Sequence, residues 1–141
     1  MTMLFHLAFP VHDIGLAKAF YHDILGCKIG RETDNALVIQ LGLHQLVAHK
    51  IDDSLPEQLS IYPRHFGLIF LEKKLFDDFI QRLERHQVVF KIPLKTRFPH
   101  TKIEHQSFFL SDPSNNLLEF KYYTHDSAIF GEKTHRLIGE K

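Results

Sequence analysis

The chain has 141 residues, of which 44% are hydrophobic and 24% charged, and its 17 basic side chains balance 17 acidic ones. A balanced charge argues against nucleic acid or an anionic membrane as a partner, because both require a basic surface. The single cysteine excludes an intrachain disulfide, and no apolar run approaches the roughly 18 residues of a membrane span. These features predict one cytoplasmic domain over residues 1–141. Eleven histidines raise the expectation of a metal site without locating it.

The first half of the chain predicts a strand, a helix and three further strands. Residues 3–11 form an apolar run that Pro10 confines to the edge of a sheet. Asp13 is a suitable N-cap for a helix over about 14–25, whose apolar residues recur at helical spacing, and Gly26 ends this helix. Short runs between turn residues predict the next strands, 27–31, 36–41 and 44–50.

The second half repeats this order of elements after a surface linker over residues 52–63. A strand over 65–71 opens with a histidine, a helix follows over about 73–86, and residues 88–92 are β-branched and aromatic enough for a strand. Residues 93–105 contain two prolines and predict a loop. A hairpin and a charged tail complete the chain: strands 107–110 and 117–122, then a tail that we expect to be frayed or laid on a partner subunit.

The repeated order predicts an α+β fold with two βαβββ modules, about 3–51 and 64–123, followed by a C-terminal tail over 124–141. The single helix of a module cannot cover both faces of its sheet. The two mixed sheets are therefore expected to curl around a shared cavity that is lined from both halves.

The stretch from Asp112 to Tyr123 combines a turn with a strand that carries one acid. Asp-Pro followed by Ser-Asn-Asn is strong turn chemistry, because proline presets φ and asparagine tolerates the left-handed region. Glu119 lies among apolar residues of the strand, where a carboxylate is costly unless it is paired or binds a metal. Its alternative is a solvent-facing position that it shares with Lys121.

Strand periodicity brings a set of metal-binding residue types to corresponding faces. If the two modules pair first strand to first strand, His6 and His65 become neighbours in the cavity, and Glu119 arrives from the last strand. Two imidazoles and a carboxylate that leave other coordination positions open suit Fe(II). The same ligand set also binds Zn(II), Ni(II) or Mn(II), for which it is less characteristic. Gln45 and His49 share one face of their strand and are candidates for a fourth position.

The remaining histidines fall in predicted loops, turns or polar faces, where solvated side chains are expected. They are His12, His22, His44, His86, His100, His105, His125 and His135. A lone histidine in a strand is also more often packed or exposed than metal-bound, so His6 and His65 carry weight only together with Glu119.

Four motifs in this order resemble the vicinal oxygen chelate superfamily. Residues 6–11 resemble its opening strand, 20–26 are similar to its F-Y-x-x-x-L-G signature, and 65–67 resemble the start of its second module. Residues 112–120 resemble its D-P-x-G-N-x-(I/L)-E ending, with Asn115 in place of the usual glycine. The superfamily includes glyoxalase I, bleomycin-resistance proteins, fosfomycin-modifying enzymes, methylmalonyl-CoA epimerases and extradiol dioxygenases.

The resemblance implies metal positions at His6, His65 and Glu119. Gln45 aligns with a glutamate that serves glyoxalases as both ligand and base, and an amide cannot be a base. His49 on the same face is the expected proton-transfer residue, since histidine works near neutral pH. A set of two histidines and one glutamate is what extradiol dioxygenases present. Those enzymes usually add a histidine and a tyrosine upstream of the glutamate, where this chain has no tyrosine, although His105 is nearby.

The expected function is therefore that of a divalent-metal-dependent enzyme, dioxygenase-like, acting on a small substrate with vicinal oxygens, with Fe(II) favoured. The alternatives are a glyoxalase I-type lyase or isomerase, and a metal-free binding or resistance protein. A homodimer is expected by resemblance, with the site within one chain or across two. Arg97 or Lys102 could hold an anionic group. The metal-free alternative is favoured by a phenylalanine-rich lining, namely Phe66, Phe70, Phe98, Phe108 and Phe109.

Overall fold

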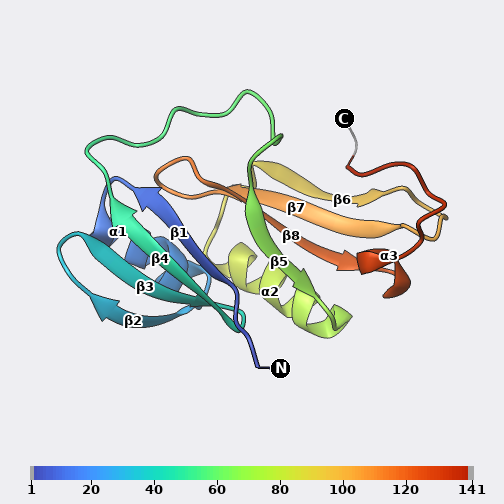
Figure 1. The fold of residues 1–141 in the computed structure, drawn as a ribbon, viewed down its shortest axis with the longest axis horizontal. Helices are drawn as coiled ribbons and strands as arrows, with labels where there is room; N and C mark the ends of the chain where they lie inside the picture. The colour runs from blue at the N-terminus through green and yellow to red at the C-terminus, as the bar shows by residue number, and fades with distance from the viewer. Residues whose placement is uncertain (1, 140–141) are drawn as a thin grey trace.

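The computed structural model describes residues 2–139, which form two mixed sheets of four strands with helices packed against one face of each (Figure 1). The strand orders are β1-β4-β3-β2 and β5-β8-β7-β6. In each sheet the first and last strands of the module pair in parallel, and the other pairs are antiparallel. The predicted α+β fold of two repeated units is confirmed. The elements are β1 His6–Val11, α1 Ile14–Lys18, η1 Ala19–Ile24, β2 Lys28–Glu32, β3 Ala36–Leu41, β4 His44–Lys50, β5 Phe66–Phe70, α2 Lys73–Arg85, β6 Ile92–Arg97, β7 His105–Ser111, β8 Leu117–Tyr123 and α3 Ser127–Phe130.

The first module, β1–β4, follows its sequence signals closely. Pro10 lies in β1, an edge strand of its sheet, as predicted. The Asp13 side chain accepts a hydrogen bond of 2.8 Å from the backbone N–H of Leu16 and caps α1. The helix continues as the π-helical η1, and the chain leaves it through Gly26, whose φ of +81° favours glycine.

The second module, β5–β8, corrects one prediction. Residues 88–91 are not a strand, and β6 occupies Ile92–Arg97, where a loop was predicted. Val89 is 90% exposed, so its β-branched side chain does not occupy a buried position in a sheet. Pro93 is tolerated because β6 is an edge strand, where a missing N–H breaks no ladder.

Pairing between the first strands of the two modules does not occur in the described residues, because β1 pairs with β4 and β5 with β8. The modules meet through side chains instead: the rings of Phe9 and Phe66 lie 5.3 Å apart between centroids. Apolar residues from both modules form one core cluster, and Arg82 of α2 donates to the carbonyl oxygens of Asp23 and Ile24 at the end of η1. None of the helices in the described range is long and apolar enough to span a membrane.

The Asp112–Asn116 turn also joins the modules. The buried Asp112 carboxylate accepts hydrogen bonds from the Tyr21 hydroxyl at 2.8 Å and from the Asn116 side-chain amide at 2.9 Å. The same amide of Asn116 donates to the carbonyl oxygen of Pro10 in β1 at 2.8 Å. Asn115 has a φ of +66°, the left-handed conformation that favours the glycine it replaces. The turn that identified the last strand is therefore also a link between the two sheets.

Candidate metal centre

Glu119 and His65 form a close pair on the open face of the second sheet. Glu119 lies in β8 and His65 directly precedes β5; His65 Nε2 is 3.2 Å from Glu119 Oε1. Both side chains are mostly shielded, with 21% of His65 and 12% of Glu119 exposed. Lys121 Nζ lies 3.7 Å from the same carboxylate oxygen. Glu119 is thus a paired carboxylate in a pocket, not the solvated acid of the alternative interpretation.

Hydrogen bonding fixes which nitrogen of His65 is available to a ligand. Nδ1 donates to the carbonyl oxygen of Ile61 at 2.7 Å, so in the neutral ring the lone pair lies on Nε2, which faces Glu119. A second bond of this kind is the usual way in which metal-binding histidines are oriented. In the metal-free state the hydrogen bond to Glu119 raises the pKa of His65. Burial alone would raise the pKa of Glu119, but His65 and Lys121 outweigh it and lower that pKa.

Gly67 is required by the close approach of β5 to β8. It stands opposite Glu119 in the parallel register, and a Cβ on Gly67 would overlap the backbone carbonyl oxygen of Glu119. The absence of a side chain lets β5 lie close enough to hold His65 against the carboxylate. The glycine after the His65-Phe66 pair therefore has a packing cause that bears directly on the site.

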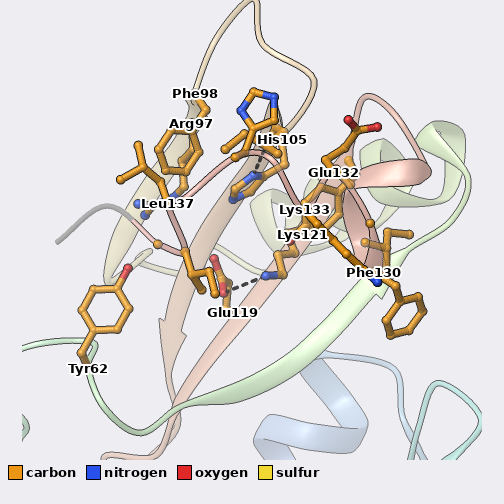
Figure 2. A pocket seen from close by; sticks show the side chains of 18 of the residues that line it. Tyr62, Arg97, Phe98, His105, Glu119, Lys121, Phe130, Glu132, Lys133 and Leu137 are labelled. Carbon is orange, nitrogen blue, oxygen red and sulfur yellow. Dashed lines mark hydrogen bonds and ion pairs between the residues drawn. The ribbon is translucent and has the colours of Figure 1, made fainter.

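A pocket of about 580 Å³ surrounds this pair. Its floor is the open face of the second sheet, and its outer wall is the C-terminal segment, residues 127–139 (Figure 2). This segment lies on the sheet of its own chain, so it is not frayed in the described residues; its contact with a partner subunit stays a prediction, and residues 140–141 lie outside the described range. This pocket is lined by the second module, the end of the linker and this segment. Residues of both modules line a smaller pocket of about 180 Å³, which also includes His65. The polar and charged lining residues of the larger pocket include Tyr62, His65, Arg97, His105, Glu119, Lys121, Tyr123, Glu132, Lys133 and His135.

His105 was expected to be solvated, and it is 6% exposed in the wall of this pocket. Its Nδ1 donates to the Ile103 carbonyl oxygen at 3.0 Å, and its ring lies 4.7 Å from that of Tyr123. Burial lowers the pKa of His105, so the ring is neutral near pH 7. Strand alternation could have found this residue. His105, Ser107 and Phe109 lie on one face of β7, and Phe109 is the register partner of Glu119 on β8.

The predicted donors of the first module lie on a different sheet. His6 opens β1 beside Gln45 of β4, and His6 Nδ1 donates to Gln45 Oε1 at 2.7 Å. This bond leaves the lone pair of His6 on Nε2, as in His65. His49 shares the face of Gln45 but lies four residues further along β4, about 13 Å away, and is exposed. No group of three metal-binding side chains comes together within residues 2–139.

Some of the other candidate residues line the pocket and some do not. Arg97 lines it and is 4% exposed, whereas Lys102 is exposed and lies outside its lining. Phe98 lines the pocket, and the Phe109 ring packs 5.0 Å from that of His65. Of the other three phenylalanines of the predicted lining, Phe108 belongs to the core cluster, and Phe66 and Phe70 are partly buried and pack against it. The site is better described as a pocket lined by polar side chains that can bind a metal than as a pocket lined by aromatic rings.

Two βαβββ modules, with a histidine and a glutamate on the open face of one sheet, define a fold of the glyoxalase type. The profile of the Glyoxalase/Bleomycin resistance protein/Dioxygenase superfamily matches residues 3–120. The chain therefore belongs to this superfamily, as its motifs predicted. A comparison with curated proteins gave no match.

Solved structures agree with this assignment. A glyoxalase/bleomycin resistance protein/dioxygenase from Alicyclobacillus acidocaldarius is 41% identical, with a TM-score of 0.86 over 92% of this chain and 97% of that one. The fosfomycin resistance protein FosX from Listeria monocytogenes, complexed with Mn(II) and sulfate, is 20% identical, with a TM-score of 0.70 over 96% and 99%. A lactoylglutathione lyase from Agrobacterium tumefaciens is 19% identical, with a TM-score of 0.67 over 93% and 98%. The last two share the fold.

Proposed function

We propose that this protein is a divalent-metal-dependent enzyme, dioxygenase-like, that acts on a small substrate with vicinal oxygens. The observation that carries this proposal is the His65–Glu119 pair, in which a tethered imidazole presents Nε2 to a shielded carboxylate inside a pocket. An imidazole nitrogen and a carboxylate oxygen are suitable ligands for Fe(II), which we favour, and also for Zn(II), Ni(II) or Mn(II). Such an ion, when bound, lowers the pKa of substrate oxygens and stabilises the negative charge that develops on them.

The third ligand in this proposal is His6 of a second copy of the chain. Its own chain keeps His6 on the other sheet, with Nε2 available and the ring oriented by Gln45. Exposed apolar side chains beside His6 also favour burial against a partner. They are Met3, Leu4, Phe5 and Leu43. In such a homodimer, His6 of one chain completes the metal centre that His65 and Glu119 of the other chain begin.

Proton transfer during the reaction has two candidates in this chain. His105 lines the pocket, is neutral near pH 7 and keeps the lone pair of its neutral ring on Nε2, which suits a general base. His49 lies on the same sheet face as Gln45, so it would reach the centre only from the partner. Loss of turnover in His105→Gln but not in His49→Gln would assign the role to His105, and the opposite result to His49.

A glyoxalase-type lyase is the second candidate, since a lactoylglutathione lyase and FosX share this fold. The bond from His6 to Gln45 counts against it, because the amide already serves as an acceptor and cannot take a proton from a substrate. A metal-free binding protein is disfavoured because, of the five candidate phenylalanines, only Phe98 is among the lining residues of this pocket, whereas Phe66, Phe70 and Phe108 lie in the core or pack against it.

The test is metal content after anaerobic loading with Fe(II), Zn(II), Ni(II) or Mn(II), followed by elemental analysis of untagged protein. We expect about one metal per chain in the wild type and almost none in His6→Ala, His65→Ala or Glu119→Ala. The matched control is His86→Ala, which removes an exposed histidine outside the pocket. Wild-type metal content in the three site variants would overturn the proposal.

Mixing variants tests whether the centre is shared between chains. His6→Ala and His65→Ala chains, unfolded together and refolded as a 1:1 mixture, form mixed dimers in which one of two centres has all its donors. The mixture should regain about a quarter of the wild-type metal content and catechol-cleaving activity, whereas each variant alone regains none. No recovery in the mixture, with both variants folded, would mean that the centre is not shared.

A further inference from the structure

We infer that Lys121 is a substrate-binding residue of this pocket, whose ammonium donates a hydrogen bond to an ionised oxygen of a ligand with vicinal oxygens. The inference rests on the proposed function, and it names a further residue of that site and the charge of its substrate. It starts from the position of Lys121 beside the Glu119 carboxylate in the pocket (Figure 2).

Strand β8 places Lys121 on the pocket floor between Glu119 and Tyr123. The three residues alternate along β8, so they point to the same face, and all three line the pocket. Lys121 Nζ lies 3.7 Å from Glu119 Oε1 and 5.3 Å from the centroid of the Tyr123 ring. The Lys121 side chain is 25% exposed, so it is partly shielded but accessible to a molecule in the pocket.

The Lys121 ammonium has hydrogen-bonding capacity that the chain does not use. A distance of 3.7 Å from the Glu119 oxygen allows electrostatic attraction but exceeds the length of a hydrogen bond. Within residues 2–139 the ammonium makes this ion pair and the cation–π contact with Tyr123, but no hydrogen bond. Its three N–H donors are therefore available to water or to the oxygen of a ligand.

A metal ion at Glu119 would change the charge that surrounds Lys121. In the metal-free chain the carboxylate and the ammonium balance each other. A divalent cation on the same carboxylate adds positive charge that one carboxylate cannot neutralise together with the ammonium. In a shielded pocket this excess favours a ligand that brings negative charge over a neutral one. The favoured substrate is therefore a compound with two vicinal oxygens, at least one of them ionised.

The alternative role of Lys121 is to hold the Glu119 carboxylate in place, and the two roles predict opposite effects on metal affinity. An ammonium beside a ligating carboxylate repels the metal ion, so its removal strengthens metal binding if Lys121 serves the substrate. Its removal weakens metal binding if Lys121 is needed to orient Glu119. His65 already lies 3.2 Å from the carboxylate, closer than Lys121, which favours the first role.

Lys121→Met tests the inference, because methionine keeps much of the aliphatic side chain and removes the charge. The probe is 4-nitrocatechol, which has vicinal oxygens and is ionised at one of them near neutral pH. Calorimetry measures the Zn(II) affinity of each metal-free protein, and then the affinity of each Zn(II)-loaded protein for the probe. We expect Lys121→Met to bind Zn(II) about threefold or more tightly than the wild type. It should bind the probe about tenfold more weakly.

Two further variants and a spectrum sharpen this test. Lys121→Arg keeps a positively charged donor and should retain most of the affinity for the probe. Lys28→Met, on an exposed residue of β2 outside this pocket, is the matched control and should change neither affinity. The visible absorption of 4-nitrocatechol shifts to longer wavelength when its second hydroxyl ionises. At the same pH, the probe bound to the wild type should therefore be more ionised than the probe bound to Lys121→Met.

The outcomes distinguish failure of this inference from failure of the proposed function. The inference is refuted, and the metal centre stands, if Zn(II) binds but the wild type does not bind the probe, or Lys121→Met binds it equally well. A joint loss of Zn(II) and probe affinity in Lys121→Met also refutes it, because Lys121 then only orients Glu119. If the wild type binds no metal, the proposed centre and this inference are both refuted. Lys121→Gln provides the same comparison if Lys121→Met does not fold.

Discussion

The two modules have the same strand order but treat their open sheet faces differently. In the second module this face contains buried polar residues, Arg97, His105 and Ser107, beneath the C-terminal segment. In the first module the corresponding face presents His6 and His49, and both are exposed. The repeated framework therefore fixes where donor groups point, while the segments outside it decide whether those groups are enclosed.

This difference explains why one chain supplies only part of the expected ligand set. The second module holds a histidine and a carboxylate 3.2 Å apart, whereas the first holds a histidine against an amide. An imidazole beside a neutral amide on an exposed face forms no site by itself. The following substitutions test whether the stability of the two modules differs in the way that these contacts predict.

The largest effect is expected at Gly67. Gly67→Ala forces a Cβ against the backbone of Glu119 and should lower the free energy of unfolding by about 4 kcal/mol, because the two paired strands must separate. Ala8 follows His6 as Gly67 follows His65, and Ala8→Gly should cost only about 1 kcal/mol. Urea denaturation of both variants measures the difference. Equal losses would show that the close approach in the second module is not special.

Loss of the carboxylate that joins the modules should have the next largest effect. Asp112→Ala leaves the Tyr21 hydroxyl and the Asn116 amide without their buried acceptor, at a cost of about 3 kcal/mol. Asp34→Ala, in an exposed turn of the first module, should change stability by less than about 0.5 kcal/mol. Thermal denaturation of the two variants provides the measurement. A small change in Asp112→Ala would mean that the remaining contacts between the modules hold them together without this carboxylate.

The smallest effect concerns pH and the metal-free His65–Glu119 pair. The pKa of His65 is raised, so the stabilisation by the pair is fully present below the ordinary histidine pKa and is lost as the pH rises through the raised value. The stability advantage of wild type over Glu119→Gln should therefore be about 1 kcal/mol larger at pH 5.5 than at pH 8.5. Denaturation in chelator at the two pH values measures it. A constant advantage would show that the pair is not charged in the folded protein.

Much of the fold was predictable because local signals agreed with tertiary structure. The Asp13 cap, the Gly26 end of the helix and the edge position of Pro10 each have a local physical cause. The position of β6 was not predictable, because a proline such as Pro93 indicates a loop unless the strand is known to lie at a sheet edge. Sequence patterns also carry no information about which distant strands meet, and so the separation of His6 from His65 required the structure.

The site was predictable where a residue type was out of place. Glu119 in an apolar strand indicated a paired or metal-bound carboxylate, and the structure pairs it with His65. For His105 the sequence carried only the weaker signal of strand alternation, because its burial depends on the Phe98 and Tyr123 rings and on the C-terminal segment. The segment itself has no periodicity that would predict its contact with the sheet.

The C-terminal segment has a consequence for the rates of ligand exchange. β8 ends at Tyr123, so residues 127–139 can move away from the pocket without breaking a strand pair. Entry and exit are then separated from the pairing of the strands: a ligand can be held by groups on β6, β7 and β8 and exchange through a wall whose displacement leaves every strand pair in place.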